Sequence, residues 1–148
     1  MEMEEEAIID KIDKYLSKPY WIIDVLPMQV PANGEGQYFR IEEYVRHSSL
    51  METISRKFLA LLLKINCYEA MDLFHAVDGW EHNPAPERLE QCLMAHDSLH
   101  VLFASMDSLI SISGDDSYMT LYTSDEKVVE LLRPLAASVG LFVWQPKA

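Results

Sequence analysis

Long hydrophobic runs are missing from this sequence. A membrane-spanning helix needs about 20 consecutive, predominantly apolar residues, and the chain contains no such run. The opening stretch MEMEEEAIID is acidic, whereas a secretory signal peptide begins with positive charge. We therefore expect a cytoplasmic protein with no transmembrane segment and no membrane contact.

Cysteine and glycine motifs are scarce as well. Cys67 and Cys92 do not form a Cys-x-x-Cys pair, and in a reducing compartment they are expected to be buried thiols. Gly34 and Gly36 lack the third glycine and the lysine of a phosphate-binding loop, and no serine lies in a Gly-x-Ser-x-Gly elbow. The sequence therefore predicts no cofactor.

Positive charge is limited to 12 lysines and arginines against 24 acidic residues, a net charge of −12. Nucleic-acid binding needs a cationic surface, so this balance argues against it. Residues 65–97 hold seven acidic side chains against Arg88 alone. Solubility explains most of this charge, and a docking face for a basic protein partner is the more specific alternative.

What is present is a balanced globular composition with one dominant helix. A length of 148 residues, with 49% hydrophobic and 24% charged residues, predicts one domain over residues 1–148. Residues 49–66 begin with Ser49 and Glu52, a capping box, and their apolar residues recur every three or four positions. The apolar arc is wider than a surface helix needs, so we expect this helix to be buried at the centre of the fold.

The other elements follow from periodicity and turn chemistry. We expect further helices at 5–17, 87–95 and 124–139, the last with a capping box from Thr123 and Glu126 and a kink or break at Pro134. Residues 38–46 fit a helix or a strand, and we favour a short helix. Strands are expected at 21–26 (possibly an edge strand, because Pro27 follows), 70–77, 98–104, 108–113, 118–123 and 141–144.

These elements predict an α+β fold, with a mostly antiparallel sheet of about five to six strands and the helices packed on one face. Residues 98–123 form a three-strand meander in this scheme, which would leave Tyr118 and Tyr122 on its outer face. Gly140 is expected to end the last helix as its C′ residue.

Histidines are the candidates for metal chemistry. His96 and His100 have a spacing that would put two imidazoles on one face of a helix, as zinc ligands require. Asp97 lies in a predicted turn, however, so the two side chains should diverge. We expect no bound metal, and a metal-dependent hydrolase using His82, His96, Asp97 and His100 is the alternative function. His75 is expected to be a hydrogen-bonded core residue.

Aromatic residues beside acidic ones are the candidates for partner contact. Trp80 lies in a predicted irregular loop, residues 78–86, next to Asp78 and Glu81, and Tyr118 and Tyr122 lie on the outer face of the meander. Aromatic side chains are enriched at interface cores. The sequence therefore favours a non-enzymatic protein-binding or regulatory domain with a basic partner, such as a toxin-neutralising immunity protein.

Overall fold

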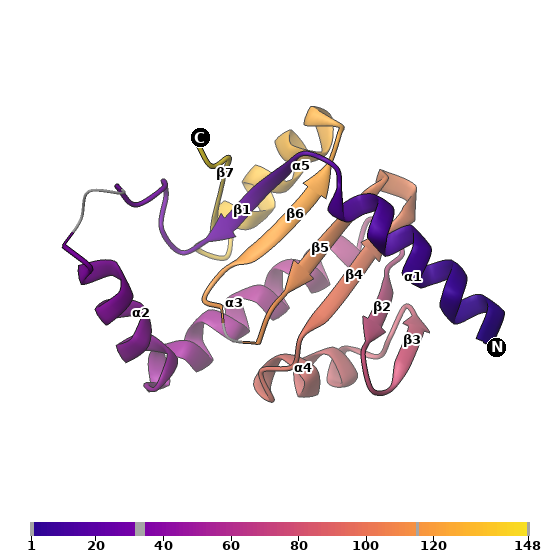
Figure 1. Ribbon diagram of the computed structural model, residues 1–148, viewed down its shortest axis with the longest axis horizontal. Coiled ribbons are helices and arrows are strands. Elements are labelled where there is room, and N and C mark those ends of the chain that lie inside the picture. Colours follow the sequence, from indigo (N-terminus) through magenta and orange to yellow (C-terminus); the bar gives the residue numbers. More distant parts are fainter. Residues whose placement is uncertain (1, 32–34, 115, 148) are drawn as a thin grey trace.

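The structure, a computed structural model, describes residues 2–31, 35–114 and 116–147. Within these ranges five α-helices accompany a seven-stranded antiparallel sheet, which confirms the α+β fold class, with a strand or two more than expected. The strand order is β3-β2-β4-β5-β6-β1-β7 (Figure 1). The strands are β1 Tyr20–Asp24, β2 Asp72–His75, β3 Gly79–His82, β4 Leu99–Phe103, β5 Ser108–Ile112, β6 Met119–Thr123 and β7 Phe142–Trp144.

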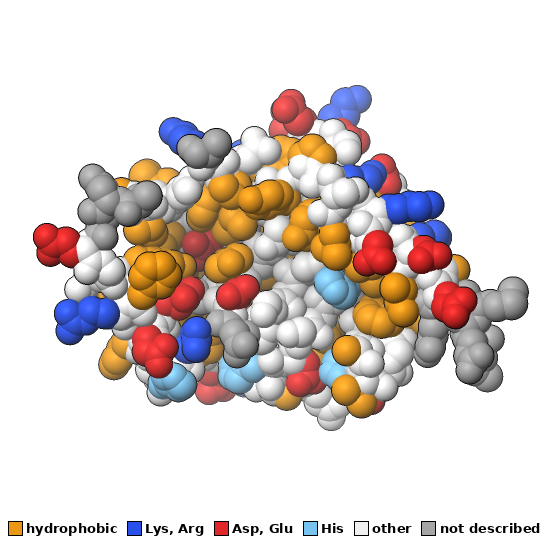
Figure 2. All heavy atoms as spheres, viewed as in Figure 1, with side chains coloured by type: hydrophobic (Ala, Val, Ile, Leu, Met, Phe, Trp, Pro, Cys, Tyr) orange, Lys and Arg blue, Asp and Glu red, His pale blue; other side chains and the backbone are white. Residues whose placement is uncertain are grey.

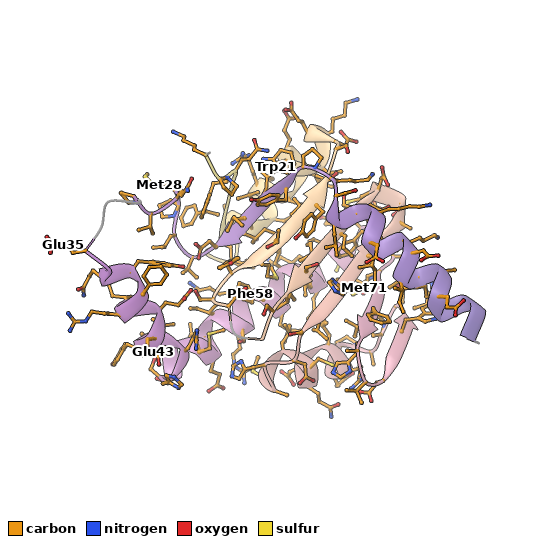
Figure 3. All side chains as sticks on the ribbon, in the orientation of Figure 1. Trp21, Met28, Glu35, Glu43, Phe58 and Met71 are labelled. Carbon is orange, nitrogen blue, oxygen red and sulfur yellow. The ribbon has the colours of Figure 1, made fainter. Side chains whose placement is uncertain are left out.

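The expected central helix is α3, Ser49–Asn66. Its inner side chains are fully buried and join those of the strands in one core, which includes Trp21, Phe58 and Met71 (Figure 3). The predicted capping box is wrong by one residue. The side chain of Ser48 accepts the cap hydrogen bond from the Leu50 N–H at 3.2 Å, so Ser49 is already inside the helix.

Helices α4, Pro86–Met94, and α5, Glu126–Ala137, pack beside α3 behind the sheet (Figure 1). The capping box predicted for α5 is also wrong, because Asp125 accepts the cap hydrogen bond, from the Lys127 N–H at 2.9 Å. The helix continues through Pro134, so no break occurs there. Gly140 does end this segment as expected, with φ at 81°.

Helix α1, Glu2–Leu16, lies on the opposite face, in front of the sheet (Figure 1). Its Ile12 packs against Leu102 of β4 and Leu109 of β5, in a second small cluster of buried side chains. The expectation of helices on one face therefore holds for α3, α4 and α5 but not for α1. The physical reason is that Leu102 and Leu109 put apolar side chains on the outer face of β4 and β5, and these side chains need cover.

Two predictions about strands are wrong. Residues 78–86 were expected to be irregular, but β3 pairs with β2 and places Trp80 opposite Phe74. Strand β1 was expected as a possible edge, but it lies between β6 and β7. Because β1 ends at Asp24, before Pro27, the proline removes no hydrogen bond from the ladder.

Helix α2, Gln37–Arg46, confirms the favoured helical interpretation of the ambiguous segment. It has no buried residue, and Phe39 and Tyr44 are exposed. Cys92 is buried as expected, whereas Cys67, the C-cap residue of α3, is exposed, so the expectation of a buried thiol is wrong there. Within the described ranges, no helix has the length and apolar character needed to cross a membrane.

The position of Leu62 in the core gives a direct test of this packing. Leu62 is 0% exposed, and we expect Leu62→Ala to lower the free energy of unfolding by about 2–5 kcal/mol, because the truncation leaves a cavity. Denaturant unfolding measures this change. Leu50→Ala, at the exposed start of the same helix, is the control and should cost under about 0.5 kcal/mol. A similar loss in both variants would contradict the packing described.

Candidate functional site

The five predicted contact residues do not form one surface. Trp80 and Glu81 lie in β3, with Asp78 just before it, at one edge of the sheet. Tyr122 lies in β6 and Tyr118 precedes it. Strands β2, β4 and β5 separate these two groups, so they must be considered separately.

The acidic side chains next to Trp80 are paired within the protein. Arg88 of α4 reaches both of them, and its Nη2 binds the Asp78 carboxylate while its Nε donates to Glu81 at 3.1 Å. The hydrogen bond from Arg88 lowers the pKa of Asp78. The single basic residue of this region therefore engages both carboxylates beside Trp80 and compensates part of their charge.

The histidines proposed for the alternative hydrolase have separate hydrogen-bond partners. His82 Nδ1 lies 2.7 Å from Asp72 Oδ1 in the β2–β3 hairpin, and His100 Nδ1 lies 2.7 Å from Ser111 Oγ on the outer face of the sheet. His96 adopts a left-handed backbone conformation, φ 59°, just after α4. The fold does not bring these three histidines together, because they belong to a hairpin, a sheet face and a turn.

Among the described residues, one group of side chains has ligand atoms close enough to hold a metal: His75, Cys92 and Asp97, within 4.8 Å of one another. His75 Nε2 lies 2.9 Å from Asp97 Oδ2, while its Nδ1 accepts the N–H groups of Val77 and Asp78, both at 3.2 Å. A metal-bound histidine donates a hydrogen bond from its other ring nitrogen. Here that nitrogen is an acceptor, so the geometry fits a structural hydrogen bond from Nε2 to Asp97.

Cys92 completes this group without becoming reactive. The side chain is 1% exposed, and burial raises the pKa of its thiol, although Arg88 acts in the opposite direction. A reactive cysteine needs a stabilised thiolate and access to solvent. Cys92 therefore contributes to the core, and His75 is the hydrogen-bonded histidine that the sequence predicted.

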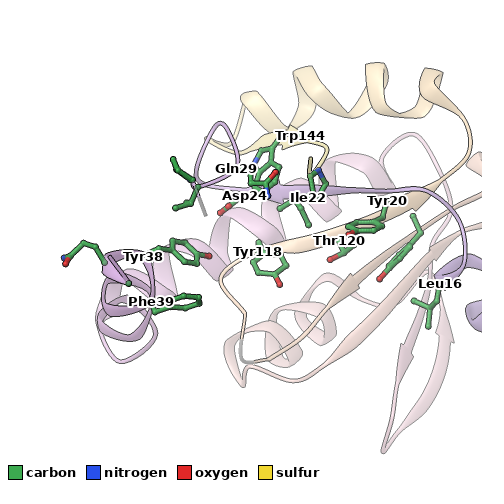
Figure 4. A pocket seen from close by; sticks show the side chains of 16 residues that line it. Leu16, Tyr20, Ile22, Asp24, Gln29, Tyr38, Phe39, Tyr118, Thr120 and Trp144 are labelled. Atoms are coloured by element: carbon green, nitrogen blue, oxygen red, sulfur yellow. The ribbon is translucent and has the colours of Figure 1, made fainter. Parts of the chain in front are cut away.

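A large hollow lies elsewhere, on the outer face of the sheet. It is a groove of about 1030 Å³ that runs over β1 and β6 between the end of α1, the start of α2 and the C-terminal tail (Figure 4). Hydrophobic side chains gather over this part of the surface, with acidic side chains among them towards α2 (Figure 2). Six aromatic residues line the groove: Tyr20, Tyr38, Phe39, Tyr118, Tyr122 and Trp144.

The groove exists because α1 covers only part of the outer face. Alternate residues of a strand point to the same face, so Tyr20, Ile22 and Asp24 of β1 lie beside Thr120 and Tyr122 of β6. Helix α1 packs over β4 and β5 instead, so it does not cover this part of the sheet. The five side chains form the floor of the groove, in which Tyr20 is exposed while Ile22 and Asp24 are buried.

The walls are held by contacts between distant parts of the chain. Trp144 Nε1 donates to the Leu26 carbonyl at 3.0 Å, and the Lys147 N–H donates to Gln29 Oε1 at 2.7 Å. These bonds fix the segment after β1 against the C-terminal tail. On the floor, the Tyr20 and Tyr122 rings lie 6.0 Å apart, a contact distance for aromatic pairs.

One end of the groove is acidic. Asp24, the last residue of β1, is 4% exposed, and its Oδ1 accepts the Val25 N–H at 2.7 Å. Glu42 of α2 adjoins this end through the lining residue Tyr38, whose hydroxyl donates to it at 3.0 Å, and it also accepts from Ser117 Oγ at 3.2 Å. Figure 4 shows Asp24, Tyr38 and Tyr118 at this end of the groove.

These groups influence one another electrostatically. Burial raises the pKa of Asp24, and the nearby Glu42 charge raises it further, although backbone N–H groups act in the opposite direction. Burial and the surrounding carboxylates, including Asp116, also raise the pKa of Tyr118. The acidic end therefore places carboxylates beside the phenol rings of Tyr38 and Tyr118, in a site that is partly shielded from water.

Sequence reasoning identified only part of this groove. Tyr118 and Tyr122 were predicted contact residues and both line it, whereas Asp24, Tyr38 and Trp144 were missed. The available signal was the segment Trp21–Asp24, where a carboxylate ends an otherwise apolar strand. A carboxylate in such a position is costly unless it is paired.

Comparison with known proteins adds no relative. No protein-family model matches the chain, and no curated protein or solved structure matches it either.

Asp24 should make stability fall as pH rises. Because its pKa is raised in the folded state, the folded protein holds this proton more tightly than the unfolded chain, and stability is lost as pH rises through the raised pKa. Asp24→Asn removes the charge and keeps an acceptor for Val25. We expect this variant to unfold at a higher temperature than the wild type at pH 7, with the difference shrinking towards pH 4.

Glu130→Gln, which neutralises an exposed carboxylate on α5, is the control and should leave the melting temperature almost unchanged. A lower melting temperature for Asp24→Asn at pH 7 would mean that the Asp24 carboxylate is stabilised in the fold.

The positions of the histidines lead to a prediction about metal binding. Neither EDTA nor added zinc should change the melting temperature, because His75 Nδ1 is occupied as an acceptor and the other histidines are dispersed. Thermal unfolding with elemental analysis measures this. An increase in melting temperature with zinc that disappears in Cys92→Ser would instead assign a metal to the group of His75, Cys92 and Asp97.

Proposed function

We propose that this protein is a cytoplasmic, non-enzymatic binding domain that holds a segment of a protein partner in its aromatic groove. The observation that carries this proposal is the groove itself, with six aromatic side chains around a volume of about 1030 Å³. Pockets for small molecules usually range from about 300 to 1,000 Å³. A groove at the upper limit of this range has room for several residues of a peptide chain.

The aromatic lining supports a protein as the ligand. Tyrosine and tryptophan are the residues that most often dominate binding energy at interfaces. In this groove Trp144 and the Tyr20–Tyr122 pair are held in place by the fold, Trp144 through its bond to the Leu26 carbonyl. Side chains that are already ordered lose little conformational freedom on binding, so the groove is organised before a partner arrives.

Net charge supports a basic partner. A protein with a net charge of −12 attracts cationic proteins at long range, and such complementary charge mainly speeds association. An inhibitor of a basic protein, such as an immunity protein, remains one form of this proposal. The acidic surface near Trp80 is the weaker candidate for the contact, because Arg88 pairs with both Asp78 and Glu81.

The hydrolase alternative has less support. Its residues His82, His96 and His100 lie apart, and Asp97 is engaged by His75. General acid–base catalysis needs such groups within hydrogen-bond reach of one substrate. The binding function needs only the groove.

Selection of peptides from a randomised display library tests the proposal. We expect the wild type to enrich a family of peptides, and Thr120→Trp to lose them, because an indole at position 120 would fill the floor of the groove. Trp80→Ala is the matched variant for the other candidate surface and should bind the same peptides as the wild type. Circular dichroism confirms that both variants fold.

Enriched peptides that bind Thr120→Trp as well as the wild type would contradict the groove as the site. Loss of binding in Trp80→Ala alone would mean that the partner binds at β3 and not in the groove. Failure to enrich any peptide family would count against a peptide-binding groove.

A further inference from the structure

The carboxylates at the acidic end of the groove accept hydrogen bonds from neutral donors, whereas several other surface carboxylates pair with a basic side chain. Asp107 pairs with Lys18 at 2.9 Å, and Glu81 pairs with Arg88 at 3.1 Å. The hydrogen bonds of Asp24 come instead from backbone N–H groups, and those of Glu42 come from hydroxyl groups. These neutral donors orient the two carboxylates but do not offset their charge.

Aromatic rings stand beside this charge. Tyr38 lines the groove, and its hydroxyl donates a hydrogen bond to Glu42. The charges of Glu42 and Asp24 both contribute to the raised pKa of Tyr118. The face of an aromatic ring attracts a cation, and the attraction grows where water is excluded. Carboxylates and phenol rings around one space are therefore complementary to a cation at the end of an apolar stem.

The opposite end of the groove is apolar. Leu16, Tyr20 and Tyr122 lie there. Tyr122 is four residues along the chain from Tyr118, and at the rise of a strand this spacing corresponds to about 13 Å. An extended ligand that reaches both ends would place its cation and its apolar side chain about four residues apart.

We propose that the acidic end of the groove, which is lined by Asp24, Tyr38 and Tyr118 and adjoined by Glu42 through its hydrogen bond with Tyr38, binds a basic side chain of the partner. An apolar side chain of the same segment occupies the end at Tyr20 and Tyr122. This inference rests on the proposed function. It deepens it by stating what the partner presents: a lysine ammonium or an arginine guanidinium in an extended segment, with a large apolar residue about four positions away. Both cations share the chemistry that the site recognises, and they differ in shape.

A cation would relieve a cost that the empty groove carries. Asp24 is buried near the Glu42 charge, and this environment disfavours its ionised form. A positive group in the groove beside Asp24 would favour that ionised form. Complementarity of this kind discriminates strongly between ligands, because a neutral side chain leaves the charges uncompensated and an acidic one adds to them.

Synthetic pentapeptides test the inference. The probe is acetyl-Lys-Ser-Gly-Ser-Phe-amide, and its matched forms carry arginine, norleucine or glutamate in place of lysine. Norleucine keeps the apolar stem and lacks the charge. Titration of the nitrogen-15-labelled protein, followed by amide chemical shifts, gives the affinity of each peptide and shows which residues respond.

We expect the lysine and arginine peptides to bind on the order of tenfold more tightly than the norleucine peptide, and the glutamate peptide to bind most weakly. Asp24→Asn combined with Glu42→Gln should reduce the lysine peptide to the affinity of the norleucine peptide. Glu130→Gln, an exposed carboxylate on another element, should leave all affinities unchanged. A preference for arginine over lysine would identify a guanidinium site, and the reverse an ammonium site.

The outcomes separate this inference from the proposed function. Equal affinity of the lysine and norleucine peptides, with both lost in Thr120→Trp, would overturn the cation site and leave the groove as a binding site. Lysine-dependent binding that persists in the Asp24→Asn, Glu42→Gln double variant would place the cation elsewhere and overturn the inference. Absence of any response in the groove residues would also overturn it, whereas display selection tests the groove itself.

Discussion

The packing of α3 against one face of the sheet is the interaction on which the rest of the structure depends. Phe58, Leu61, Leu62 and Ile65 are 0–1% exposed, and the helix spans about 27 Å at the usual rise, long enough to cross several strands. Burial of this kind dominates the free energy of folding. Because α3, α4 and α5 all occupy that face and α2 buries no side chain, α1 is the helix that packs on the other face.

One helix cannot cover a seven-stranded sheet, and the groove is the part that it leaves open. The uncovered floor carries tyrosines, whose rings pack on apolar neighbours while their hydroxyl groups stay in contact with water. This face can therefore stay open to solvent although not all of its side chains are polar. The proposed binding site therefore exists because three helices pack on one face of the sheet, while the helix on the other face covers only part of it.

The acidic side chains near Trp80 and those at the groove have different kinds of partner. Around Trp80, Arg88 of α4 forms ion pairs with both Asp78 and Glu81, so part of the charge there is compensated within the protein. At the groove, Asp24 and Glu42 lie close enough to repel each other, and natural proteins keep such costs mainly where function requires them. Because of this difference, we place the candidate binding site at the groove and not at β3.

The sequence by itself determined the fold class, the bounds of α3 and the strands of the meander, because periodicity is a local property that reports which side chains are buried. It also placed Tyr118 and Tyr122 on an outer face. Strand order, the cover supplied by α1, the pairing of Arg88 and the meeting of Asp24 with Glu42 were decided only by tertiary structure. Each of these joins residues far apart in the chain, and no local pattern records how distant segments pair.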